Sequence, residues 1–143
     1  MPNSPELPAG SRRILVAHSE GGIRFAVADY FRYRGFRVEE AETEPMAGRM
    51  LRERDYDALL TDYHFAERTG EGLRLARQAR VSSPRTLLCL FAPPLDPAEA
   101  MAASQLVDLL ITRPRPLSDV AQTLFALLQA PAAVSSIPTP RGS

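Results

Sequence analysis

Residues 57–65 read DALLTDYHF, an apolar run that ends at Asp62 and then turns polar. Such a short, continuous run is typical of a strand that is buried on both faces of a parallel sheet. A carboxylate at the end of a buried strand loses hydration, and proteins usually tolerate this loss only where the carboxylate is paired or used. The sequence therefore makes Asp62 the first candidate for a functional residue.

Further strand patterns lie along the chain. Near-continuous apolar runs occupy residues 14–17, 58–61, 87–91 and 109–112. Residues 36–39 instead alternate between apolar and polar side chains, which suits an edge strand with one wetter face. The patterns together predict five strands.

The segments between these strands have the spacing of amphipathic helices. One apolar stripe, ending before Gly35, comprises Ile23, Ala26, Val27, Tyr30 and Phe31, and a second comprises Leu117, Val120, Ala121, Leu124 and Leu128. Pro45 and Pro97 suit first helical turns, and Asp96 and Glu99 have the spacing of a capping box. Strands that alternate with helices predict a doubly wound α/β domain, whose ligand site lies beyond the carboxyl ends of the strands, where Asp62 is placed.

The composition limits the classes of partner. The chain has 143 residues, enough for one domain, and its 17 Lys and Arg residues balance 17 Asp and Glu residues. The balanced charge gives no positive field that would attract nucleic acid, and no apolar stretch is long enough to span a membrane, so we expect neither as a partner. The single cysteine, Cys89, lies in an apolar run, which is typical of a cytoplasmic protein. Residues 1–11 and 131–143 contain prolines and few large apolar groups, and we expect disorder there and a domain at 12–130.

Common catalytic and cofactor motifs are missing from the sequence. The turn HSEGG at 18–22 lacks the spacing and the lysine of a phosphate-binding loop. The sequence has no Ser, His and Asp in the order and spacing of a nucleophile elbow. It also has no second histidine at metal-binding spacing from His18 or His64, and no pair of cysteines. We therefore expect no enzyme, no cofactor and no metal. A flavodoxin-type flavin site, which needs Ser, Thr and Gly in that turn, remains a distant alternative.

At four stretches the chain resembles a known family. These stretches are RRILVAHSE at 12–20, YDALLTDYHFAERTGEGL at 56–73, LLCLFAPP at 87–94 and LLITRPRPL at 109–117. They look like the receiver domain of bacterial two-component response regulators. The resemblance implies a flavodoxin-like, CheY-like sheet of five parallel strands in the order 2-1-3-4-5 with helices on both faces. It also implies that Asp62 holds the phosphoacceptor position, with Gly70 and Pro114 matching further family positions.

Other positions of the family's phosphorylation site depart from its pattern. In the family, two acids after the first strand hold Mg²⁺ with the phosphoacceptor, a hydroxyl ends the fourth strand and a lysine ends the fifth. Here the acidic pair aligns with His18 and Ser19, the hydroxyl with Phe91, the lysine with Arg113, and the aromatic switch position with Leu110. Because imidazole and hydroxyl groups do not replace carboxylate charge in a Mg²⁺ site, we expect Mg²⁺ binding to be weak or lost.

Two arrangements around Asp62 remain open. In the first, Arg113 and His18 neutralise Asp62 without metal, and Phe91 closes the pocket. In the second, Arg113 extends into water, His18 caps its own loop, and Asp62 bonds backbone amides.

The resemblance leaves two functions. The first is a degenerate, pseudo-receiver module of phosphorelay signalling that acts by protein–protein contact. The alternative is a single-domain receiver that still accepts phosphate on Asp62. In either case the expected partners are a histidine kinase, a phosphotransfer protein or another signalling protein, with a homodimer as a further option.

Overall fold

The computed structural model of the chain describes residues 12–65, 71–112 and 116–129, apart from the side chain of Leu117. Strands and helices alternate throughout these residues. The strands are β1 (Arg13–Ala17), β2 (Arg37–Ala41), β3 (Ala58–Asp62), β4 (Leu87–Ala92) and β5 (Leu109–Thr112), and the helices are α1 (Gly21–Tyr33), α2 (Glu44–Glu53), α3 (Glu71–Ser82), α4 (Pro97–Leu106) and α5 (Leu117–Gln129).

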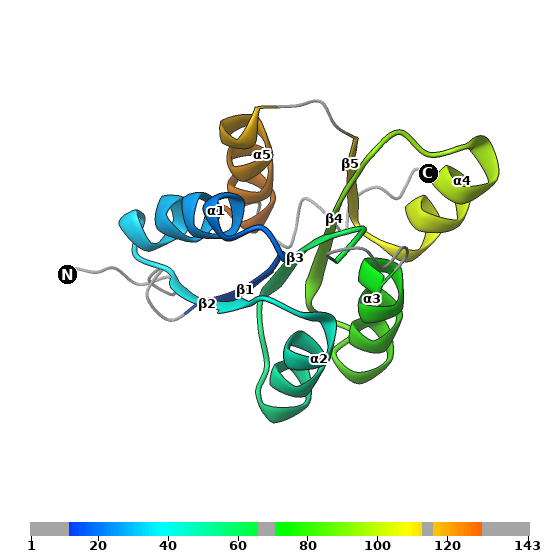
Figure 1. Ribbon diagram of the computed structural model, residues 1–143. Helices are drawn as coiled ribbons and strands as arrows, with labels where there is room; N and C mark the ends of the chain where they lie inside the picture. Colours follow the sequence, from blue (N-terminus) through cyan, green and yellow to red (C-terminus); the bar gives the residue numbers. More distant parts are fainter. Residues whose placement is uncertain (1–11, 66–70, 113–115, 130–143) are drawn as a thin grey trace, which may run out of the picture.

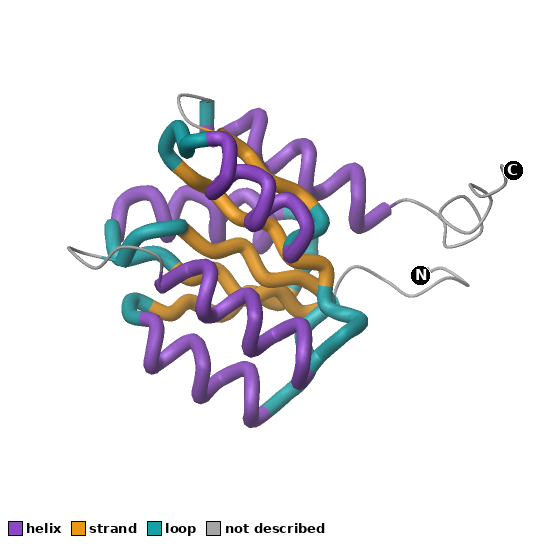
Figure 2. Tube along the Cα trace, turned by 90° about the vertical axis from the view of Figure 1, so that its right-hand side faces the viewer, coloured by secondary structure: helices purple, strands orange, loops and turns teal. Residues whose placement is uncertain are grey.

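The strands form one parallel sheet in the order β2-β1-β3-β4-β5. Helices α1 and α5 cover one face, and α2, α3 and α4 cover the other (Figure 1). Figure 2 shows the same three layers from the side, with the sheet between the two groups of helices. The predicted strand order and the helices on both faces are confirmed.

The hydrophobic core has two halves, one on each face of the sheet. Successive side chains of a strand point to opposite faces, so Leu15 packs toward α2 and α3 while Ile14 and Val16 pack toward α1 and α5. Leu59 and Leu60 of β3 divide between the two halves in the same way. Burial on both faces explains why these strands read as continuous apolar runs.

The helix boundaries follow local capping rules. Asp96 and Glu99 form the predicted capping box at the start of α4, which begins at Pro97. After α1, Gly35 adopts a φ of 92°, a conformation that favours glycine. Helix α4 buries only Ala103 among its described residues, in accord with its few large apolar groups.

Two local predictions need correction. Strand β2 covers Arg37–Ala41 rather than residues 36–39, because its pairing follows β1 up to the partners Ala17 and Ala41. In α1, Ala26 is exposed and Ala28 is buried beside Val27. The two alanines flank the same stripe, and their small side chains leave the apolar pattern unable to say which one faces the sheet.

No helix within the described ranges combines the length and the apolar character that crossing a membrane requires.

Candidate functional site

Three predicted site residues meet at the carboxyl edge of the sheet. His18 follows β1, Asp62 ends β3, and Phe91 lies in β4 directly beside Asp62 in the strand register. All three side chains belong to buried residues. Parallel strands bring their carboxyl ends to one edge, which is why residues from distant parts of the sequence gather here.

The imidazole of His18 faces the carboxylate of Asp62. Nε2 of His18 lies 3.4 Å from Oδ2 of Asp62. The other ring nitrogen, Nδ1, accepts a hydrogen bond of 3.0 Å from the backbone N–H of Glu20. Because an accepting nitrogen carries no proton, this bond assigns the proton of the neutral imidazole to Nε2, on the side of Asp62.

Asp62 also accepts a backbone hydrogen bond. Its Oδ1 accepts from the N–H of Tyr63 at 3.0 Å, and the same N–H donates to the carbonyl of Phe91 at 3.0 Å. The carboxylate therefore faces an imidazole on one side and accepts from a peptide N–H on the other.

These contacts combine parts of both sequence hypotheses. The imidazole of His18 faces Asp62, as in the first, metal-free arrangement. The hydrogen bond from the Glu20 N–H to His18 Nδ1 and the hydrogen bond from the Tyr63 N–H to Asp62 are those expected in the second arrangement. Arg113, on which the two hypotheses differ, lies outside the described residues, as do Gly70 and Pro114.

Arg24, which sequence reasoning missed, fixes the backbone of His18. One terminal nitrogen of its guanidinium donates to the carbonyl of His18 at 2.8 Å, and its Nε donates to Oε1 of Glu40 at 3.1 Å. Glu40 in turn accepts from Arg32 at 2.9 Å. Helix α1 and strand β2 thus hold the loop that carries the imidazole. The sequence feature that pointed to this role of Arg24 was a charged residue on the partly buried side of a helix.

Gly72 is the second residue that sequence reasoning missed. A Cβ atom at this position would lie 1.8 Å from the backbone oxygen of Asp62, so only glycine lets the first turn of α3 approach the end of β3. Its N–H also donates to the carbonyl of Tyr63 at 3.0 Å. Glycine is disfavoured inside helices, and its presence in the first turn was the signal in the sequence.

Comparisons with known proteins identify the fold. No family model and no curated protein matches the sequence. A CheY-like response regulator receiver domain protein from Methanospirillum hungatei matches in structure with a TM-score of 0.72 and 17% identity, over 82% of this chain and 93% of that one. The response regulator TrrA from Thermotoga maritima, solved with Mg²⁺-BeF, matches with a TM-score of 0.67 and 19% identity, over 81% and 98%.

The chain has the receiver fold. A chain described as adenylate cyclase from Rhodopirellula baltica shares this fold, with a TM-score of 0.70 and 19% identity over 82% of this chain and 87% of that one. At these identities the comparisons establish the architecture and leave the chemistry to the residues of the site.

In this receiver fold, the described residues do not fit a Mg²⁺ site. Glu20, the acid nearest to the His18–Ser19 pair, is exposed, and its Oε1 accepts from the N–H of Ile23 at 2.8 Å to cap α1. Within the described ranges, no three His, Cys, Asp or Glu side chains are grouped to hold a metal ion. One carboxylate facing an imidazole differs from the oxygen-rich ligand set that Mg²⁺ prefers.

The remaining predicted positions that the structure describes lie in β4, in β5 and directly after His18. Phe91 is buried against the α1 and α5 half of the core, where it has no hydroxyl to offer a phosphoryl group. Leu110 is partly buried in β5 and pairs with Leu90. Ser19 is partly buried directly after His18.

Tyr63, next to Asp62, keeps its phenol proton. Burial, with the nearby carboxylates of Glu99 and Asp96, raises the pKa of Tyr63 above its ordinary value. The residue therefore adds no negative charge beside Asp62 at neutral pH.

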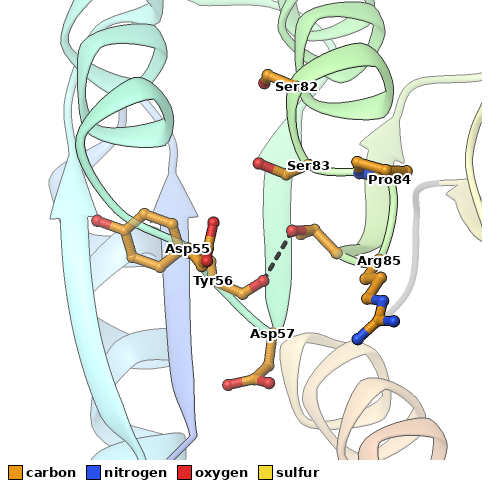
Figure 3. Close-up of a pocket in the computed structure, with 8 residues that line it drawn as sticks. Asp55, Tyr56, Asp57, Ser82, Ser83, Pro84 and Arg85 are labelled. Carbon is orange, nitrogen blue, oxygen red and sulfur yellow. Dashed lines mark hydrogen bonds between the residues drawn. The ribbon is translucent and has the colours of Figure 1, made fainter.

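A pocket of about 430 Å³ opens at the opposite end of the molecule, at the amino ends of β3 and β4 (Figure 3). Two of its lining polar groups have partners within the fold. The hydroxyl of Thr86 donates to the carbonyl of Tyr56 at 2.7 Å, and Oδ2 of Asp57 accepts from the N–H of Arg13 at 2.7 Å. Because ligands of doubly wound sheets bind at the carboxyl ends of strands, the Asp62 edge is the better candidate site.

Proposed function

We propose that this chain is a degenerate receiver domain of two-component signalling. It acts by protein–protein contact, and phosphorylation of Asp62 is impaired or lost. The observation that carries the proposal is the imidazole of His18, whose Nε2 lies 3.4 Å from Oδ2 of Asp62. The family resemblance implies that His18 takes an acidic-pair position.

Charge balance supports this proposal. In an active receiver, as the family resemblance implies, Mg²⁺ offsets the charge of the carboxylates and of the incoming phosphoryl oxygens. A bound cation of this kind supplies several kcal/mol of charge stabilisation. His18 and Ser19 bring no carboxylate charge to hold such a cation, while the Nε2–H of His18 already faces the carboxylate. Asp62 is thereby accommodated without metal.

Phe91 supports the proposal from the neighbouring strand. The residue is 5% exposed, and the family resemblance implies that it takes the place of a hydroxyl that bonds the phosphoryl group. A phenyl ring donates no hydrogen bond, and Phe91 is the residue paired with Asp62 in the strand register. Phosphorylation of Asp62 would therefore have no hydroxyl through which to change the conformation of the domain. Leu110 likewise replaces the aromatic side chain of the switch.

The partners of such a module are signalling proteins. We expect a histidine kinase, a phosphotransfer protein or another cytoplasmic signalling protein to recognise the receiver surface, with no catalysis by the chain itself. A second candidate, a receiver that accepts phosphate on Asp62, is favoured by one observation. The carboxylate is retained at the carboxyl end of β3, at the predicted phosphoacceptor position.

Titration with Mg²⁺ and beryllofluoride, followed by amide NMR, tests the metal part of the proposal. The matched variant carries both His18→Asp and Ser19→Asp, which restore the acidic pair. We expect no saturable change in the natural chain and Mg²⁺-dependent changes near residue 62 in the double variant. A saturable, Mg²⁺-dependent response of the natural chain would contradict the proposal and favour the second candidate.

A further inference from the structure

Two adjoining cavities lie at the amino edge of the sheet, where helices α2 and α3 end. The first is the pocket of about 430 Å³ at the amino ends of β3 and β4, and the second, with a volume of about 380 Å³, opens beside it. Asp55, Ser82 and Ser83 line both cavities, which together form the α2–α3 groove (Figure 3). The groove is separate from the Asp62 site, which lies at the other edge of the sheet.

Ser83 brings a hydroxyl without a partner to the α2–α3 groove. The residue is 8% exposed, and Figure 3 shows its oxygen turned toward the space between the two helices. Its backbone N–H donates to the carbonyl of Ala79 at 2.7 Å, and its carbonyl accepts from the N–H of Thr86 at 3.0 Å. In the part of the chain that the structure describes, its hydroxyl makes no hydrogen bond, whereas the hydroxyl of Ser82 donates to the carbonyl of Gln78 at 2.9 Å. Because buried polar groups are normally hydrogen-bonded, this hydroxyl points to a ligand in the groove.

Two helix ends make the α2–α3 groove electrically negative. Helices α2 and α3 end at Glu53 and Ser82, and the last carbonyl groups of a helix lack partners within it and carry the negative end of its dipole. Pro84 has no N–H to offer to the carbonyl of Arg80, which would be its acceptor in a longer helix. The exposed carboxylate of Asp55 adds a full negative charge, and it makes no ion pair within the described residues. The groove therefore favours a cation.

The arginines around the groove do not cancel this charge. A terminal nitrogen of Arg54 lies 2.9 Å from Oε2 of Glu39, with which it is paired. The side chain of Arg85 points away from the two helix ends in Figure 3. The charge of Arg52 is offset by that of Glu53, which lines the same cavity.

An ammonium group matches the acceptors of the groove. Such a group has three N–H donors and no acceptor, and the groove offers it the Asp55 carboxylate, the Ser83 hydroxyl oxygen and the carbonyl groups of the helix ends. A metal ion fits less well, because no three His, Cys, Asp or Glu side chains within the described ranges are grouped to hold one. Leu51 in one cavity and Pro84 in the other supply apolar walls for an alkyl chain.

We propose that the α2–α3 groove binds a primary alkylammonium group, which donates to the carboxylate of Asp55 and to the hydroxyl of Ser83. The alkyl chain extends from there into the larger cavity, beside Pro84. A free polyamine and the lysine side chain of a partner protein both carry this group. Its binding uses none of the Asp62 chemistry and is independent of the function proposed above.

Amide NMR of the full chain at low ionic strength, titrated with putrescine, butylamine or butanol, tests the proposal and separates the two sources. We expect saturable shifts at residues 51–55 and 82–86 with both amines and none with butanol, which has an alkyl chain of the same length and no charge. Putrescine that binds about tenfold or more tightly than butylamine identifies a free polyamine as the ligand. Equal affinities identify a single ammonium group, as on a lysine side chain.

Two substitutions should weaken the binding of butylamine. We expect a loss of about tenfold or more for Asp55→Asn and of several-fold for Ser83→Ala. The thermal unfolding midpoint of the ligand-free Ser83→Ala chain should stay unchanged or rise, because the hydroxyl has no partner to lose. Weaker binding by that variant is therefore not a consequence of misfolding.

Two further variants provide matched controls. Ser82→Ala removes a hydroxyl that lines the same groove but already donates to the carbonyl of Gln78, so the affinity should stay unchanged. Asp29→Asn removes an equal charge from α1, on the opposite face of the sheet, and should also leave the affinity unchanged. The absence of saturable shifts with millimolar amine would overturn the proposal. So would binding of butanol as tight as that of butylamine, or equal losses in Asp29→Asn and Asp55→Asn.

Discussion

Nε2 of His18 lies 3.4 Å from Oδ2 of Asp62, at the edge of the sheet where a receiver of the family pattern would gather carboxylates around a metal ion. The Glu20 N–H bond to Nδ1 fixes the tautomer that turns the Nε2 proton toward Asp62. His18 thus places an imidazole nitrogen, rather than a carboxylate, within 3.4 Å of the buried Asp62 carboxylate.

Removal of this partner should destabilise the fold. We expect His18→Ala to lower the free energy of unfolding by about 1–3 kcal/mol, because the buried Asp62 carboxylate loses the polar group that faces it. In an Asp62→Asn background the same substitution should cost less, giving a coupling of about 0.5–3 kcal/mol in a double-mutant cycle measured by urea unfolding. Equal costs in both backgrounds would show that the two side chains do not interact.

Two glycines should respond oppositely to alanine. Gly72→Ala places a Cβ against the backbone of Asp62 and should destabilise by about 3 kcal/mol or more, since the backbone of β3 has to move. Gly21→Ala, whose Cβ would meet only the end of Arg24 at 3.6 Å, should stabilise by up to about 1 kcal/mol. Urea midpoints of the two variants compare them directly, and a tolerated Gly72→Ala would refute the close approach of α3 to β3.

Phe91 should contribute through packing. Its replacement by alanine should cost about 3–5 kcal/mol, because the ring is 5% exposed within the core. Phe25→Ala is the matched control, since that ring is 59% exposed and its loss should change stability by less than about 0.5 kcal/mol. Similar losses in the two variants, measured by thermal or urea unfolding, would argue against a buried ring beside Asp62.

Alkaline pH should reveal the buried thiol of Cys89. Burial, helped by the charge of Asp108, raises the pKa of Cys89 from about 9 to about 12. Between these values the unfolded thiol loses its proton and the folded thiol keeps it, so stability falls as pH rises, by about 1.4 kcal/mol per pH unit. Between pH 8 and pH 10, the free energy of unfolding should fall more in the natural chain than in the Cys89→Ala variant. A pH-independent difference would show an unperturbed thiol.

The sequence carried enough information for the strands but less for the site. Apolar runs such as residues 58–61 mark strands reliably because a sheet covered on both faces leaves few polar positions within them. The contact of His18 with Asp62 follows from the fold that the resemblance implied. The roles of Gly72 and Arg24 did not follow, because each depends on a contact between elements far apart in the sequence. The use of Glu20 as the cap of α1 did not follow either, because it depends on where that helix begins.

The central claim is that Asp62 is balanced without metal or phosphate, and its most direct test is the intact mass of the protein after incubation with acetyl phosphate and Mg²⁺. An Asp62→Asn variant and the double variant with His18→Asp and Ser19→Asp serve as controls. We predict that the natural chain gains little or no phosphoryl mass compared with the double variant. Efficient phosphorylation of the natural chain that Asp62→Asn abolishes would contradict the account and make the chain a working phosphoacceptor.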